Sequence, residues 1–221
     1  FVVDCKGEIE LYGQKYHCWK EKGHRLMGLR NAIKQSCDVY FYEISRRLGV
    51  DRMSVTAKKF GLGSKVFYFF GEEKSGIVPN TKWKLKNIGK GWVLGETLLA
   101  GIGQGYFLAT PLQLANATSL LASGGSSTTP HLFLRSIDRV NNEVSNFKYN
   151  ENENSIDIDT ESLHIVNESM WRVIYDKKIG TASHIKKVEG LGLEAHKLLG
   201  CKGISRTEFI LDKVTKKFYI L

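Results

Sequence analysis

The sequence predicts a mainly helical α/β fold. Its 221 residues, of which 42% are hydrophobic, suffice for one ordinary domain or most of a larger one. The chain opens with a short β-type run at 1–5, and several later stretches repeat apolar residues every three or four positions, the period of an α-helix. Because the chain enters a strand without an initiator Met or a polar lead-in, we expect it to begin inside a domain.

The expected helices follow one another along the whole chain. Gly49 stands where the C-terminal cap of the first stretch belongs, and Thr110 followed by Pro111 is a typical helix start. A continuous apolar stripe from Leu163 to Ile174 marks the last helix. The predicted helical ranges are 26–48, interrupted near residue 36, then 51–60, 110–124 and 160–176.

Two regions between these helices predict loops. Residues 61–107 are rich in Gly, Lys and aromatic residues, and their Gly101-Ile102-Gly103-Gln104-Gly105-Tyr106 segment permits close backbone approach, as in a loop that lines a site. Residues 126–159 are polar and predict a short sheet excursion or an exposed connection.

The charge balance narrows the classes of partner. The formal charge of +9 raises nucleic acid, anionic lipid or an anionic polymer as partners, but no run of five or more basic residues occurs. Nucleic-acid sites normally cluster their basic residues on one stripe, so we expect no nucleic-acid partner. No stretch has the roughly 18 apolar residues of a membrane helix, and no signal pattern opens the chain.

The tripeptide Ser36-Cys37-Asp38 lies at the predicted helix junction and by itself is an ordinary helix cap. Longer matches change this interpretation. Residues 35–48 and 101–115, together with Gly180-Thr181-Ala182 after the last helix, resemble the penicillin-binding protein 2 family. The resemblance runs from about residue 5 to about residue 205, in the family's order.

The resemblance implies a transpeptidase domain of the penicillin-binding protein and β-lactamase-like fold, truncated at both ends and with much of its five-stranded sheet absent. It divides the chain into a partial domain at 1–206 and an unmatched tail at 207–221. The family cross-links peptidoglycan stem peptides by serine acyl transfer and binds penicillin. Its site comprises Ser-x-x-Lys, Ser-x-Asn or Ser-x-Asp, and Lys-Ser/Thr-Gly. Ser36 and Asp38 match the second motif and are the predicted catalytic residues.

The nucleophile motif is not found where the family has it. Nothing before Ser36 reads Ser-x-x-Lys, and the later strings that begin at Ser145 and Ser183 fall in the wrong order and in predicted loops. The third motif is altered: Gly200-Cys201-Lys202-Gly203 replaces Gly-Lys-Thr-Gly, which leaves Lys202 and Gly203 as the predicted substrate-binding residues. We therefore expect these residues alone to be inactive.

Three cysteines and one histidine form a separate constellation, namely Cys5, Cys18, His24 and Cys37. Three thiolates and one imidazole are a standard closed shell for structural zinc. The spacing is not that of a zinc finger, but the family resemblance implies a metal site at such positions. A disulfide, buried free thiols, and His17 in place of His24 remain alternatives.

The predicted activity and location come from the resemblance. It implies a D,D-transpeptidase on the periplasmic side of the bacterial inner membrane, with stem peptides and β-lactams as ligands of the intact protein and membrane proteins of the elongation machinery as partners. The alternative function is a non-catalytic, zinc-stabilised remnant or docking module.

Overall fold

The computed structural model describes residues 1–67, 72–126, 130, 135–138, 140–146 and 155–183, and the backbone of two strands at 209–211 and 218–220. Within these residues the chain forms seven helices and eight short strands, which confirms the mainly helical α/β class. Among the described helices, none combines the length and the apolar character that crossing a membrane requires.

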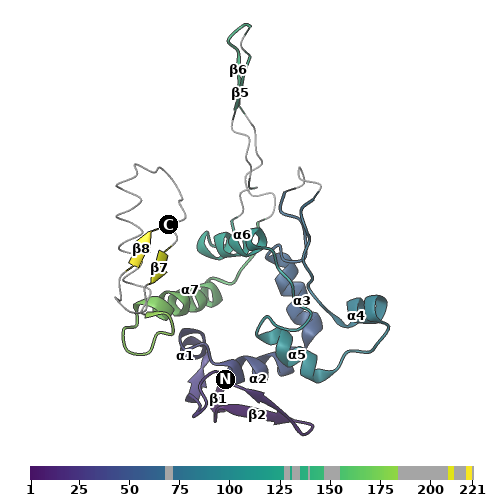
Figure 1. The fold of residues 1–221 in the computed structure, drawn as a ribbon, viewed down its shortest axis with the longest axis vertical. Helices are drawn as coiled ribbons and strands as arrows, with labels where there is room; N and C mark the ends of the chain where they lie inside the picture. The colour runs from purple at the N-terminus through teal and green to yellow at the C-terminus, as the bar shows by residue number, and fades with distance from the viewer. Residues whose placement is uncertain are drawn as a thin grey trace.

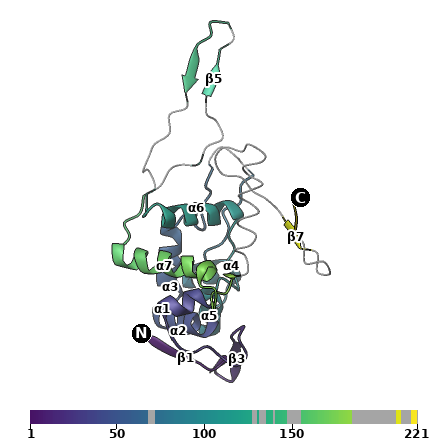
Figure 2. The same ribbon diagram turned by 90° about the vertical axis from the view of Figure 1, so that its left-hand side faces the viewer.

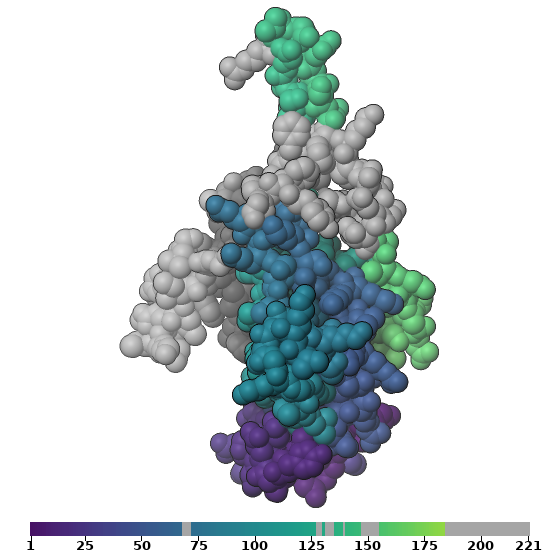
Figure 3. Space-filling view, turned by 90° about the vertical axis from the view of Figure 1, so that its right-hand side faces the viewer, coloured from purple at the N-terminus to yellow at the C-terminus, as the bar shows by residue number. Residues whose placement is uncertain are grey.

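The N-terminal region consists of two antiparallel strand pairs. Strand β1 (Val2–Cys5) pairs with β4 (Arg25–Gly28). The segment that connects these two strands in the sequence forms a separate hairpin of β2 (Glu8–Leu11) and β3 (Gln14–His17). Figure 1 shows these strands at one end of the molecule beside α2, and the space-filling view shows them as one continuous end of the body (Figure 3). This end carries Cys5, Cys18 and His24.

Two helices follow directly and meet near residue 36, as predicted. The expected start at residue 26 is wrong, because residues 26–28 pair with β1 as part of β4 and the first helix begins at Leu29. Helix α1 (Leu29–Lys34) and helix α2 (Asp38–Leu48) are separated by a turn, and α2 ends at Gly49. Helix α2 is the centre of the core because it packs against β1 and against α5 (Leu94–Gly101). Its buried side chains include Val39, Tyr40 and Tyr42, and Leu98 of α5 is fully buried beside them.

The prediction that residues 61–107 form only loops is wrong. After α3 (Val50–Lys59), this region contains α4 (Thr81–Ile88) and α5. The Asn80 side chain accepts a hydrogen bond from the Trp83 N–H at 2.7 Å, and Glu96 accepts one from the Val93 N–H at 3.0 Å, so both helices have N-terminal caps. Both helices have only eight residues and are flanked by glycines, so the sequence showed no helical repeat of apolar residues there. Helices this short depend on packing for their stability.

The last two helices match their predictions closely. Helix α6 (Pro111–Ala122) begins with Thr110, whose hydroxyl accepts from the Gln113 N–H at 3.1 Å while the Gln113 side chain accepts from the Thr110 N–H. Helix α7 (Thr160–Tyr175) packs along α1, although the two are separated by more than a hundred residues (Figure 2). This packing brings the segment after α7 to the junction between α1 and α2.

The polar region 126–159 contains the expected sheet excursion. Strands β5 (Arg135–Ile137) and β6 (Val144–Asn146) form a hairpin that projects away from the helices in both ribbon views (Figures 1 and 2). Ser145 was expected in a loop, but it lies in strand β6. Near the C-terminus β7 (Phe209–Leu211) pairs with β8 (Phe218–Ile220).

Candidate functional site

The turn between α1 and α2 holds Ser36, Cys37 and Asp38 in a constrained conformation. The Cys37 N–H donates to the Ala32 carbonyl at 2.9 Å, and the Ser36 N–H donates to the Ile33 carbonyl at 3.2 Å. Ser36 has φ +52°, in the left-handed region that is unfavourable for a residue with a side chain. Strained backbone of this kind is concentrated at functional sites, where the surrounding structure maintains it.

Ser36 and Asp38 face one hollow of the surface. Its volume is about 300 Å³, and Ile33, Phe41, Gly101 and Ile102 form the rest of its wall. Asp38 is the first residue of α2, where the helix dipole favours a carboxylate. The structure thus brings the two predicted catalytic residues to one open pocket.

The Asp38 carboxylate is also fixed by the segment after β3. Its Oδ2 accepts a hydrogen bond from the Trp19 N–H at 2.9 Å, and the Trp19 indole N–H donates to the Gln35 carbonyl at 3.0 Å. Sequence reasoning did not identify Trp19, because a backbone N–H leaves no signal in residue type. The segment that carries Cys18 therefore also positions the second motif.

Thr181 contacts the same turn from the segment that follows α7. Its Oγ1 lies 3.1 Å from the Ser36 Oγ and 2.7 Å from the Lys34 carbonyl oxygen. Lys34 in addition donates from its buried ammonium group to Asp176 Oδ2 at 3.0 Å. The sequence marked Thr181 only as part of a family resemblance, and Lys34 not at all.

On the buried side of the turn, the four predicted metal ligands form one cluster. The thiol sulfurs of Cys5, Cys18 and Cys37 and one ring nitrogen of His24 lie within 4.8 Å of one another, and all four residues are buried. His24 Nδ1 is 3.7 Å from the Cys5 Sγ and 3.4 Å from the Cys18 Sγ. Metal–ligand bonds of ordinary zinc lengths give a sulfur–nitrogen edge of roughly 3.6 Å in a tetrahedron, so the donor set fits zinc.

Close backbone approach brings these ligands together. A Cβ on Gly23 would lie 2.0 Å from the Cys5 carbonyl oxygen, and one on Gly7 would lie 2.0 Å from the Glu21 carbonyl oxygen. Both glycines have positive φ, so another residue would meet both strain and a backbone clash there. The two crossing segments carry Cys5 on one side and Cys18 and His24 on the other.

Burial shifts the proton affinities in the cluster toward the neutral forms. It raises the pKa of Cys18 and of Cys37 and lowers the pKa of His24. At neutral pH the imidazole is therefore ready to act as a ligand, whereas each thiol must release a proton to become one. The three cysteines are free thiols, and His24 Nε2 is buried without a hydrogen-bond partner among the described residues.

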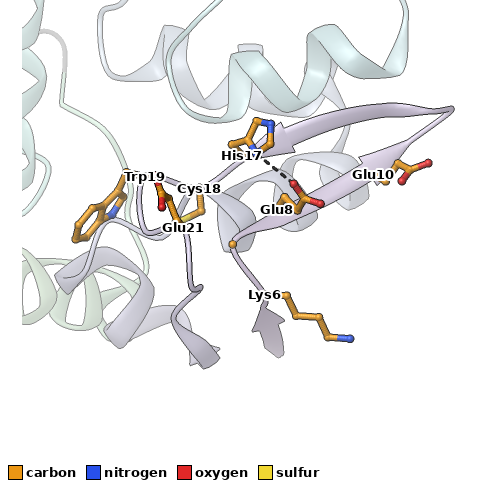
Figure 4. Close-up of a pocket in the computed structure, with 8 residues that line it drawn as sticks. Lys6, Glu8, Glu10, His17, Cys18, Trp19 and Glu21 are labelled. Atoms are coloured by element: carbon orange, nitrogen blue, oxygen red, sulfur yellow. Dashed lines mark ion pairs between the residues drawn. The ribbon is translucent and has the colours of Figure 1, made fainter.

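His17 does not belong to this cluster. Its side chain is 70% exposed and its Nδ1 lies 3.2 Å from the Glu8 Oε2, on the outer face of the hairpin. It borders a separate hollow of about 860 Å³ that is also lined by Lys6, Glu8, Glu10, Cys18, Trp19 and Glu21 (Figure 4). Glu8 there pairs with both His17 and Lys15, which leaves its charge compensated.

Comparison with known proteins decides the family. Residues 1–195 match the penicillin binding protein transpeptidase domain. The chain belongs to this family. The peptidoglycan D,D-transpeptidase MrdA of Acinetobacter baumannii is 42% identical over 133 residues, which cover 59% of this chain and 20% of the relative. The chain thus spans about a fifth of the length of the curated relatives it matches.

Solved structures agree with the transpeptidase assignment. A penicillin-binding protein (PBP2) from Helicobacter pylori is 34% identical with a TM-score of 0.71, and the match covers 83% of this chain and 33% of that one. The complex of PBP2 and MreC from the same organism matches at 33% identity and a TM-score of 0.69, over 83% and 32% of the two chains. These likenesses confirm the predicted transpeptidase fold.

The residues predicted as the third motif are not among those that the structure describes. Lys202 and Gly203, the predicted substrate-binding residues, and the fourth cysteine, Cys201, are outside the described residues. The structure therefore brings together Ser36, Asp38 and the cysteine cluster, and it leaves the roles of Lys202 and Gly203 as predictions.

Proposed function

We propose that this chain provides the second-motif part of the active site in a peptidoglycan D,D-transpeptidase. The observation that carries the proposal is the shared pocket of Ser36 and Asp38 in a chain of the transpeptidase family. By this proposal the intact protein cross-links stem peptides by serine acyl transfer and is acylated by penicillin, on the periplasmic side of the inner membrane.

The pocket chemistry supports these roles. Acyl transfer breaks an amide bond, so the leaving nitrogen must gain a proton as the serine ester forms. The Ser36 hydroxyl can both accept and donate a proton at the mouth of the pocket. Asp38 is held by the Trp19 N–H and by its place at the start of α2, so its free oxygen can orient a substrate amide.

We further propose that these 221 residues are not acylated by themselves. No Ser-x-x-Lys precedes Ser36, and Ser145, which begins one of the later strings, lies on the projecting β5–β6 hairpin. Ser183 begins the other string and follows Thr181, which contacts Ser36, and the Lys of this string lies outside the described residues. Neither string has the order of the family's first motif.

Labelling with a fluorescent penicillin tests both statements. The full-length product of the reading frame that contains this segment should acquire covalent label, whereas the isolated 221 residues should not. Ser36→Ala in the full-length product should slow labelling at least tenfold, because the proton path to the leaving nitrogen is lost. An unlabelled full-length protein would reject the catalytic proposal.

We also propose that Cys5, Cys18, His24 and Cys37 bind one zinc ion in a closed structural site. The ligand distances and burial of all four residues support this assignment, and a closed shell has no position for a reactive water. Bound there, the ion would anchor Cys37 and so hold the Ser36–Asp38 turn.

Metal analysis of the purified chain tests the zinc proposal. We expect close to one zinc per chain, lost on Cys18→Ser or His24→Ala and retained on His17→Ala, the matched control on the outer face of the hairpin. Metal-free protein that remains folded would contradict the proposal, and a disulfide between two of the cysteines would then be expected by mass spectrometry.

The partner proposal follows from a relative. Because the H. pylori PBP2 is found in a complex with MreC, we propose that the intact protein joins a similar elongation assembly. Co-purification with the MreC of its own cell, lost when the protein is replaced by the isolated 221 residues, would place that contact outside this segment.

A further inference from the structure

The hydroxyl of Thr181 bridges the second motif and the end of α1. Its Oγ1 is 3.1 Å from the Ser36 Oγ, and the two residues are 145 positions apart in the sequence. The same Oγ1 is 2.7 Å from the Lys34 carbonyl oxygen. Thr181 is therefore the side chain through which the segment after α7 contacts the strained residue Ser36.

The number of protons fixes the direction of this contact. A threonine hydroxyl has one hydrogen, and a carbonyl oxygen can only accept. Since Thr181 Oγ1 donates its hydrogen to the Lys34 carbonyl, it can only accept from Ser36. The Ser36 O–H then points at Thr181, and the lone pairs of the Ser36 oxygen are left for the pocket.

Thr181 itself is rigidly placed. Its backbone N–H also donates to the Lys34 carbonyl, at 3.2 Å, so both lone pairs of that oxygen are used. The preceding turn is closed by the Gly180 N–H, which donates to the Asp176 carbonyl at 2.8 Å, and Asp176 is bonded in turn to the Lys34 ammonium group. Lys34 thus holds the segment 176–181 with both its side chain and its backbone.

We propose that Thr181 is a positioning residue that presents Ser36 to the pocket as a hydrogen-bond acceptor. The proposal rests on the transpeptidase function of the pocket proposed above. In the resting site, Ser36 is directed to receive a proton or to hold a cationic amine. To deliver a proton to the leaving nitrogen, the Ser36 O–H must then rotate away from Thr181. The hydrogen bond from Ser36 to Thr181 forms again after each such step.

The geometry can be tested on the 221 residues without any activity. The Hα–Hβ couplings of Ser36, measured by NMR with labelled serine, should show one side-chain rotamer in the wild type and in Thr181→Ser, which keeps the hydroxyl. Thr181→Val has the same shape without an acceptor, so Ser36 should average over rotamers. Thr118→Val is the matched control, because among the described residues the Thr118 hydroxyl bonds a carbonyl of its own helix, that of Leu114.

Unchanged Ser36 couplings in Thr181→Val would overturn the proposal. If that variant fails to fold, Thr181→Cys takes its place, because a thiol keeps the size of the side chain and is a weak acceptor. A single rotamer in the folded Thr181→Cys variant would equally overturn it.

The acylation kinetics of the full-length product test the consequence. Thr181→Val should lower the acylation rate constant for penicillin about 5-fold to 10-fold, the effect of one hydrogen bond of ordinary strength, with the dissociation constant of the first complex unchanged. Thr181→Ser should restore the rate. A defect that only reduces the amount of folded protein would instead lower the labelled fraction at an unchanged rate.

The two proposals fail in different ways. No label on the wild type rejects the transpeptidase function, while the NMR couplings still decide the contact between Thr181 and Ser36. Normal labelling of the wild type together with an equal rate in Thr181→Val rejects the positioning role alone.

Discussion

The two sides of the turn at residues 36–38 are built by opposite means. Cys37 is fully buried and faces a closed cluster whose four ligands all come from the first 37 residues. Ser36 and Asp38 face an open pocket that also depends on Gly101 from α5 and on Thr181 after α7. The closed side is local and buried, whereas the open side is assembled from distant segments.

This difference teaches how the site tolerates strain. A serine at φ +52° is unfavourable by itself, and here its neighbour Cys37 is fixed by burial while its hydroxyl is fixed by Thr181. Contacts on both sides of the turn therefore stabilise the strained backbone conformation of Ser36.

The largest expected effect comes from the closed side. By the zinc proposal, Cys37→Ser should lower the free energy of unfolding by more than about 3 kcal/mol when zinc is supplied, because an ion bound by this set would couple binding to folding. Urea denaturation with and without a chelator measures this. The wild type and the variant should become similar in the chelator, and a wild type unaffected by the chelator would show that the closed side needs no metal.

The next effect concerns the wall of the open side. A Cβ on Gly101 would lie 2.5 Å from the Cβ and the Oγ of Ser45, which is buried in α2. Gly101→Ala should therefore lower the free energy of unfolding by about 1–3 kcal/mol through overpacking. Gly91→Ala is the control, because a Cβ there meets no atom within 4 Å. Equal stabilities of the two variants by denaturation would show that α2 and α5 separate freely.

A smaller effect measures the strain at Ser36 itself. Ser36→Gly and Ser36→Ala both remove the hydroxyl, but only glycine adopts positive φ without a steric cost. The glycine variant should be more stable than the alanine variant by about 1 kcal/mol, as measured by urea denaturation of the two proteins side by side. Identical midpoints would mean that the turn relaxes and that the strain is not maintained from either side.

The smallest effect is a pH dependence of the clamp that holds Thr181. The hydrogen bond from Lys34 holds the pKa of Asp176 below its usual value near 3.8. The contribution of this ion pair to stability is therefore fully present above the usual carboxyl pKa. It is lost as the pH falls through the lower pKa of Asp176 in the folded state. Asp176→Asn should be less stable than the wild type at pH 7, and the difference should shrink toward pH 3. A constant difference across this range would exclude the ion pair as its source.

Local chemistry explains what the sequence could predict. The helix start at Thr110–Pro111 and the helix stop at Gly49 depend on the local preferences of those residues, and both are found. The junction near Ser36 was predicted from the apolar spacing on either side of it, and it is also found, although Ser36 itself adopts an unfavourable positive φ. Three cysteines and one histidine within the first 37 residues likewise predicted one cluster, which the structure assembles. The chain's family, too, was evident from its motifs.

Tertiary structure decided the rest, because the decisive interactions link residues that are far apart or involve backbone groups. Helix α5 forms in a glycine-rich segment because Leu98 is buried against α2. Exposure separates His24, the imidazole predicted as a ligand, from His17, the alternative that the sequence left open. The Trp19 N–H at Asp38 and the Thr181 hydroxyl at Ser36 exist only because the folded chain brings them there. The sequence by itself determined the second motif and the three cysteines and one histidine near it, because these depend on residue type. Only packing determined which distant groups reach residues 36–38 and where they point, because those contacts form only in the folded chain.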